Sequence, residues 1–149
     1  MPRLISGASA LTRSTGAVLQ VVNTIFSTED TETTGVVTAT GLSRSITPLF
    51  ANSKLLVQLD INGVYSTVTN GAVHLYLYRD GSVENQFAQS HGYNTGGQSI
   101  TTGAFTKLVN AGSTSTTTFE LHFAMAGAGT AYINVNSASS SMTVIEIAG

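Results

Sequence analysis

The clearest pattern in the chain is an alternation of apolar and polar side chains over residues 55–61. Every second position is apolar: Leu55, Val57, Leu59 and Ile61. Gln58 and Asp60 lie between them. A period of two is typical of a β-strand with one face in a hydrophobic core and the other toward water or a partner.

The same alternation recurs at residues 73–78, 117–125 and 131–135, whereas residues 17–26 and 142–147 are apolar on both faces. Turn signals separate these stretches, above all Asn70-Gly71 and Asp80-Gly81. Short strands are also expected at residues 36–37, 41–46 and 104–109. No stretch has a sustained period of 3.6 residues, so the pattern predicts eight to ten strands in an all-β antiparallel β-sandwich, with no substantial helix.

The length of 149 residues fits one domain. We expect residues 17–149 to form a single β-sandwich head domain and residues 1–16 to form an N-terminal arm. Such an arm is either a frayed terminus or a docking segment. The docking residues would be Leu4, Ile5 and Leu11, with Arg3 and Arg13 beside them.

Composition narrows the possible partners. Charged residues make up 9% of the chain, against about 25% in an ordinary soluble domain, and the formal net charge is −2. There is no basic stripe, so we expect no nucleic-acid partner. Cysteine is absent, which excludes disulfides and cysteine-ligated zinc. No apolar run approaches the roughly 20 residues that span a bilayer, so we expect neither membrane insertion nor a cleaved leader.

Catalytic and metal-binding signatures are weak. Glu120 and His122 share one strand face about 7 Å apart, but no spacing in the chain is diagnostic of a metal. Glu29, Asp30 and Glu32 favour a solvated loop over a cation site. There is no nucleophile elbow and no phosphate-binding loop. We therefore expect a protein that is not an enzyme and carries no cofactor.

Aromatic side chains occupy strand positions where a monomer usually carries Lys and Glu. Tyrosine is favoured at interfaces because it buries a large area and keeps a polar tip. An alternative is that these tyrosines line the second sheet or face solvent. We predict a subunit interface, which also includes the final strand because Glu146 there needs a partner if it is buried. The predicted interface residues are His74, Tyr76, Tyr78, Glu120, His122, Tyr132, Val144 and Glu146.

Several short blocks resemble a family of tailed-bacteriophage virion proteins. They are Gly16-Ala-Val-Leu-Gln-Val-Val22, Thr40-Gly-Leu-Ser-Arg-Ser-Ile-Thr-Pro48, Ser53-Lys-Leu-Leu-Val57, Leu77-Tyr-Arg-Asp-Gly81, Tyr132-Ile-Asn134 and Ser141-Met-Thr-Val-Ile-Glu-Ile-Ala-Gly149. The resemblance covers about residues 16–149. It implies a jelly-roll head that forms a homotrimer, similar in style to C1q and tumour-necrosis-factor heads.

The resemblance leaves two functions open. The first is a trimeric decoration or cement protein, or a head fibre, on the capsid surface, docked through residues 1–16 onto other virion proteins. The second is the receptor-binding head of a short tail fibre that recognises a host surface glycan or protein through a loop such as residues 91–103. Only about sixteen residues precede the head, whereas fibre tips usually follow a long shaft, which favours the first. Either role implies a place on the virion surface after assembly in the host cytoplasm.

Overall fold

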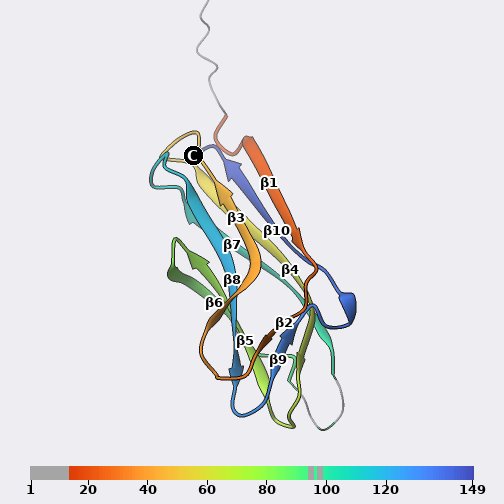
Figure 1. Ribbon diagram of the computed structural model, residues 1–149. Helices are drawn as coiled ribbons and strands as arrows, with labels where there is room; N and C mark the ends of the chain where they lie inside the picture. The colour runs from red at the N-terminus through yellow and green to blue at the C-terminus, as the bar shows by residue number, and fades with distance from the viewer. Residues whose placement is uncertain (1–13, 94–95, 97–98) are drawn as a thin grey trace, which may run out of the picture.

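The computed structural model describes residues 14–93, 96 and 99–149, and this part of the chain forms two antiparallel β-sheets packed face to face (Figure 1). The elements in chain order are β1 (Val18–Phe26), β2 (Asp30–Glu32), β3 (Thr38–Ile46), β4 (Lys54–Ser66), β5 (Ala72–Arg79), β6 (Ser82–His91), β7 (Thr101–Asn110), β8 (Thr117–Ala126), β9 (Ala131–Ile133), a short 3₁₀ turn (Val135–Ser137) and β10 (Ser140–Ile147).

The first sheet has the order β1-β10-β4-β9-β2, with β7 also paired to β4, and the second has the order β3-β8-β5-β6. Every strand pair is antiparallel. Ten strands and a single 3₁₀ turn in the described residues confirm the predicted all-β sandwich of jelly-roll type without substantial helix.

The core lies between the sheets, where the alternation predicted it. The inner side chains of β4, namely Leu55, Val57, Leu59 and Ile61, are each 2% exposed or less. Phe119, Leu121 and Phe123 of β8 close over them from the other sheet. Each such side chain stabilises the fold by about 1.5–3 kcal/mol relative to an exposed position, so this layer holds the two sheets together.

The hairpin between β5 and β6 confirms the turn predicted at Asp80-Gly81. Both residues have positive φ, 50° for Asp80 and 78° for Gly81, which a two-residue type I′ turn requires. The Asp80 carboxylate accepts hydrogen bonds from the Thr118 amide (2.8 Å) and the Thr117 hydroxyl (2.7 Å). The turn is therefore tied to the start of β8 as well as to its own strands.

Two local expectations were wrong. Residues 36–37 are not a strand, because β3 begins only at Thr38. The acidic stretch is not simply a solvated loop, because it contains β2 and buries Glu32. The Glu32 carboxylate accepts hydrogen bonds from the amides of Met125 (2.9 Å) and Gly35 (3.1 Å). Burial alone would raise the pKa of Glu32, but these bonds and those from Thr34 hold it below its usual value.

The first and last described segments lie side by side at the same end of the sandwich (Figure 1). The Gly16 amide donates to the Ala148 carbonyl (2.8 Å), and the Ala148 amide donates to the Ala17 carbonyl (2.8 Å). These bonds fix where the chain enters the domain. The domain boundary between residues 16 and 17 stays a prediction, and Arg3, Leu4, Ile5, Leu11 and Arg13 lie outside the described residues.

Candidate functional site: two outer sheet faces

Five of the predicted interface residues come together on the outer face of the second sheet. We call His74, Tyr76, Tyr78, Glu120 and His122 the tyrosine–histidine face. The register of β5 and β8 sets Tyr76 opposite His122 and Tyr78 opposite Glu120. The Tyr78 and His122 rings stack with centroids 3.7 Å apart and planes 10° from parallel. This face is thus built by two neighbouring strands, as their alternation predicted.

The polar groups of the tyrosine–histidine face interact mainly with one another. His122 Nε2 lies 3.7 Å from Glu120 Oε2, and the Tyr76 hydroxyl lies 3.3 Å from His74 Nδ1. Burial lowers the pKa of His122 below its usual value, although the Glu120 carboxylate opposes that shift. The His122 side chain is only 14% exposed, and neither ring nitrogen has a hydrogen-bond partner among the described residues. That this face contacts another subunit stays a prediction.

Tyr132 lies apart from this face. It is on β9, in the first sheet, with its ring centroid 5.8 Å from that of Tyr65 on β4. Tyr132 is half-buried there. The sequence grouped it with the other tyrosines because it alternates in the same way, but strand order separates them.

Val144 and Glu146 need a correction. Both are 0% exposed in the single chain, so neither is available to a second subunit. They point into the sandwich from β10, together with Met142, because positions of the same parity share one strand face. The prediction that these two residues contact a second subunit was wrong, because their side chains are buried within their own chain.

Glu146 finds its partners within its own chain. Its carboxylate accepts hydrogen bonds from Gln20 Nε2 (2.5 Å) on β1 and from the backbone amides of Leu49 (2.9 Å) and Phe50 (3.2 Å). Burial by itself would raise the pKa of Glu146, but the nearby Ser53 hydroxyl together with Gln20 and these backbone amides holds it below the usual value. Glu146 is thus a buried anchor that joins β1, β10 and the turn before β4.

A second outer face emerges only from the strand register. Val21 of β1 pairs with Ile145 of β10, which pairs with Leu56 of β4, which pairs with Leu108 of β7. We call these four residues the apolar row. Val21 is 56% exposed and Leu108 is 53% exposed, while the two central members are half-buried. The row therefore crosses four neighbouring strands of the first sheet, β1, β10, β4 and β7, and presents a continuous hydrophobic band to the outside.

The neighbouring row on the same face is polar and uncharged. It consists of Asn23, Thr143, Gln58 and Thr106, which the register also places side by side. Lys54 and Asp60 stand on β4 on either side of the two rows, with opposite charges. The described part of this face is thus neutral, which removes the charge repulsion that would keep two copies apart.

Part of the apolar row could be anticipated from the sequence. The sequence shows residues 17–26 to be apolar on both faces of the expected strand. In the structure, Val22 and Phe26 pack against the core while Val21 and Ile25 are exposed. Leu56 and Leu108 were missed because the other residues on the same faces of their strands are mostly polar: Lys54 and Gln58 beside Leu56, and Thr106 and Asn110 beside Leu108.

Within the described residues, no group of three or more His, Asp or Glu side chains is arranged to hold a metal ion. The described part of the chain also has no helix long and apolar enough to cross a membrane.

Comparisons with known proteins support the fold. No family model matches the chain, and no curated protein matches its sequence. Among solved structures, the chain is similar to VP2 in the infectious bursal disease virus subviral particle, with a TM-score of 0.55 and 16% identity over 87% of this chain and 33% of that one. It is also similar to the T=1 particles derived from the same virus, with a TM-score of 0.51 and 14% identity over 100% of this chain and 41% of that one.

The chain therefore has a β-sandwich fold that also occurs in viral shell proteins, and it spans 33–41% of the length of these matched chains. At such low identity, the similarity establishes the fold alone.

Proposed function

We propose that the protein is a structural component of a virion that acts as a homo-oligomer, with the apolar row at the contact between copies. The observation that carries this proposal is the exposed hydrophobic band across β1, β10, β4 and β7. Soluble monomers rarely leave a continuous apolar band open to water. Packing of further copies of this chain against the neutral face would cover the band without burying an unpaired charge.

The fold supports the virion part of the proposal. Two-sheet sandwiches occur in the infectious bursal disease virus particles that the chain resembles in structure. The resemblance of its sequence blocks to tailed-phage virion proteins points the same way. From that resemblance we take three as the number of copies, and decoration or cementing of the capsid surface as the role.

Two measurements test this function. Analytical ultracentrifugation of the purified chain should give a trimer, and a concentration-independent monomer would overturn the self-association. Quantitative mass spectrometry of purified virions should then give hundreds of copies per particle. A few dozen copies or fewer would instead indicate a fibre at the tail or at a vertex.

The docking arm has its own test. Deleting residues 1–10 should leave a soluble trimer, because residues 14–17 and the sandwich are retained. The deleted chain should no longer associate with virions, because the docking residues Leu4 and Ile5 are gone. Normal decoration by the deleted chain would contradict the assignment of Leu4 and Ile5 as docking residues.

A receptor-binding role is the second candidate. The sequence placed recognition in residues 91–103, of which residues 94–95 and 97–98 lie outside the described part of the chain. The observation that favours recognition lies elsewhere, in a groove between β6 and β7.

A further inference from the structure

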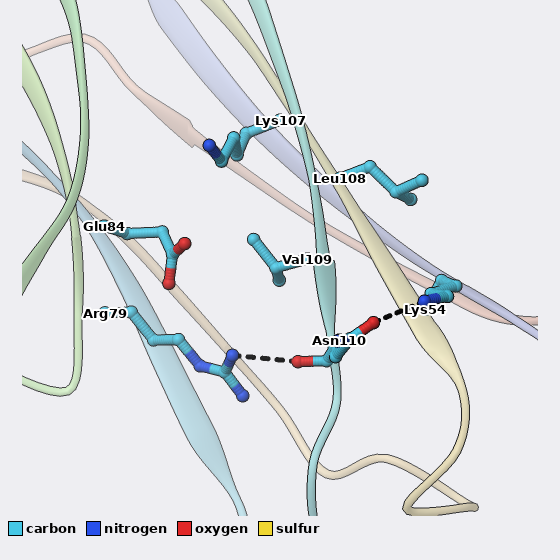
Figure 2. Close-up of a pocket in the computed structure, with 7 residues that line it drawn as sticks. All are labelled: Lys54, Arg79, Glu84, Lys107, Leu108, Val109 and Asn110. Carbon is cyan, nitrogen blue, oxygen red and sulfur yellow. Dashed lines mark hydrogen bonds between the residues drawn. The ribbon is translucent and has the colours of Figure 1, made fainter.

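A groove opens along one side of the sandwich, where edge strand β7 of the first sheet faces edge strand β6 of the second. Its volume is about 440 Å³. Small-ligand sites usually measure roughly 300–1,000 Å³. The residues that line the groove are Lys54, Arg79, Glu84, Lys107, Leu108, Val109 and Asn110 (Figure 2). Lys107 and Val109 leave β7 on the side of Glu84 and Arg79, whereas Leu108 leaves it on the opposite side.

Positive charge is concentrated in this groove. Three of the four Lys and Arg residues in the described part of the chain line it, the exception being Arg44. Glu84 is the one carboxylate among the lining residues, which together carry +2, although the whole chain carries −2. Asp80, beside the groove, pairs with Arg79 (Oδ2 to Nε, 3.9 Å) and offsets part of this charge. Such a local reversal of sign favours an anionic ligand.

The Arg79 guanidinium is held in place before any ligand arrives. Its Nε donates to the Thr117 hydroxyl (3.0 Å), and its two terminal nitrogens donate to the carbonyls of Asn110 (2.9 Å) and Ala111 (2.7 Å). Arginine has five N–H donors, so two remain for a ligand. A fixed cation binds with less loss of side-chain freedom than a mobile one.

Lys107 and Glu84 are not paired with each other. No ion pair joins them in the described residues, and Lys107 Nζ reaches only Asn85 Oδ1, at 3.4 Å. The Glu84 carboxylate has no hydrogen-bond donor among the described residues, and both side chains are half-buried. Lys107 can therefore donate a hydrogen bond to a molecule in the groove, and Glu84 can accept one from it.

We propose that this groove binds an acidic monosaccharide, a sugar that carries a carboxylate, such as a sialic or uronic acid. The sugar carboxylate accepts hydrogen bonds from Lys107 and Arg79, and its hydroxyls donate to Glu84. Val109 contacts the apolar C–H side of the ring. Glu84 disfavours a bare phosphate or sulfate, because these anions have no hydroxyls comparable to those of a sugar and repel the carboxylate. The inference goes beyond the proposed assembly role and does not depend on it.

Isothermal titration calorimetry of the full chain with N-acetylneuraminic acid and with glucuronic acid tests the proposal. At least one should bind with a Kd of about 1 mM, corresponding to about −4 kcal/mol. Glucose and inorganic phosphate serve as the neutral and the purely anionic probes, and each should bind at least tenfold more weakly. Absence of binding by both acidic sugars, or equal or tighter binding of glucose or phosphate, would overturn it.

Variants separate the groove from general electrostatics. Lys107→Gln and Glu84→Gln should each weaken binding of the acidic sugar at least tenfold, whereas Lys107→Arg should retain it within about threefold. Thr114→Glu, in the exposed loop before β8, changes the net charge as much as Lys107→Gln does and should leave the Kd within twofold. If Thr114→Glu weakened binding as much as Lys107→Gln, the loss of affinity would be explained by the net charge of the chain and not by the groove. A thermal melt of each variant shows whether it is folded. Glu84→Gln is the substitution that should disturb the core least, because Glu84 is half-buried on an edge strand.

Discussion

The two outer faces of this sandwich are built by the same alternation but differ in how their side chains are satisfied. On the tyrosine–histidine face, Tyr78 stacks on His122 at 3.7 Å and Tyr76 reaches His74 at 3.3 Å. On the opposite face, the apolar row leaves Val21 and Leu108 more than half exposed. The first face covers itself with its own aromatic rings, whereas no residue in the described part of the chain covers the second.

Aromatic side chains on an outer sheet face do not by themselves indicate that the face needs a partner. A tyrosine can bury its ring against a neighbour on the same sheet and keep its hydroxyl in water. Aliphatic side chains aligned across four strands have no such polar tip, so water is removed from them only by another surface. We therefore propose the apolar row, and not the tyrosine–histidine face, as the main contact between copies. The mutations below are designed to distinguish the two faces.

The largest effect is expected from charges placed on the apolar row. Val21→Glu combined with Leu108→Glu should weaken association at least 100-fold, about 3 kcal/mol, because two carboxylates would enter the contact unpaired. Stability of the isolated chain should change by no more than about 0.5 kcal/mol, since both positions are exposed. Sedimentation velocity over a dilution series measures the first quantity, and urea unfolding measures the second. An unchanged dissociation constant would remove the row from the interface.

A comparable effect, but on folding rather than association, is expected on the inner face of the same strand. Glu146→Leu should destabilise the chain by about 3 kcal/mol, because the Gln20 amide and the backbone amides of Leu49 and Phe50 lose their buried acceptor. Urea unfolding at pH 7 measures this loss. Gln20→Ala, which removes one donor, should cost less. If Glu146→Leu instead split the oligomer without loss of stability, Glu146 would belong to a subunit contact after all.

Acid should reproduce the loss of Glu146 in the unmodified chain. The folded-state pKa of both Glu146 and Glu32 lies below the ordinary value of 4.5. Their contribution to stability is therefore complete above pH 4.5 and declines as pH falls through the lower folded-state values. Urea midpoints measured between pH 6 and pH 3 should fall in this range, and Glu146→Leu should flatten part of that fall. A midpoint independent of pH would contradict the role of these carboxylates as buried acceptors.

Alternation was enough to predict the strands and much of the core. Leu55, Val57, Leu59 and Ile61 are buried as their spacing indicated, and Asp80-Gly81 forms the turn that its residue types favour. These features depend on neighbours within a few residues, so a single stretch of sequence contains them.

Features that depend on distant pairing could not be predicted. Met142, Val144 and Glu146 occupy every second position, so they share one face of their strand. That this face is buried could not be predicted, because a buried Glu146 needs hydrogen-bond donors, and its donor Gln20 is 126 residues away in the sequence. The apolar row joins residues 21, 145, 56 and 108, which only the register brings together. The groove likewise needs β6 and β7, which belong to different sheets.

A smaller effect is expected on the tyrosine–histidine face. Tyr76→Lys should reduce stability by about 1 kcal/mol, because the ring leaves its half-buried place beside His74, and it should leave the sedimentation coefficient of the oligomer unchanged. Tyr76→Phe, which keeps the ring and removes only the hydroxyl, is the matched control. Dissociation by Tyr76→Lys together with normal association of the Val21→Glu, Leu108→Glu double variant would reverse the roles of the two faces, as the sequence first predicted.

The smallest effect is expected from protonation on that same face. Burial lowers the pKa of His122, and the Glu120 carboxylate at 3.7 Å opposes this shift. The Tyr78 ring stacks on His122. Because folding favours the neutral imidazole, the contribution of His122 to stability is complete above its usual pKa of 6.5 and declines as pH falls through the lower folded-state value. Urea midpoints at pH 7.5 and pH 5.5 should therefore differ more for the unmodified chain than for His122→Gln, whose side chain does not titrate. If both chains lost the same amount, the ring would not be buried against Tyr78, and the distinction between a face that covers itself and a face that needs a partner would fail.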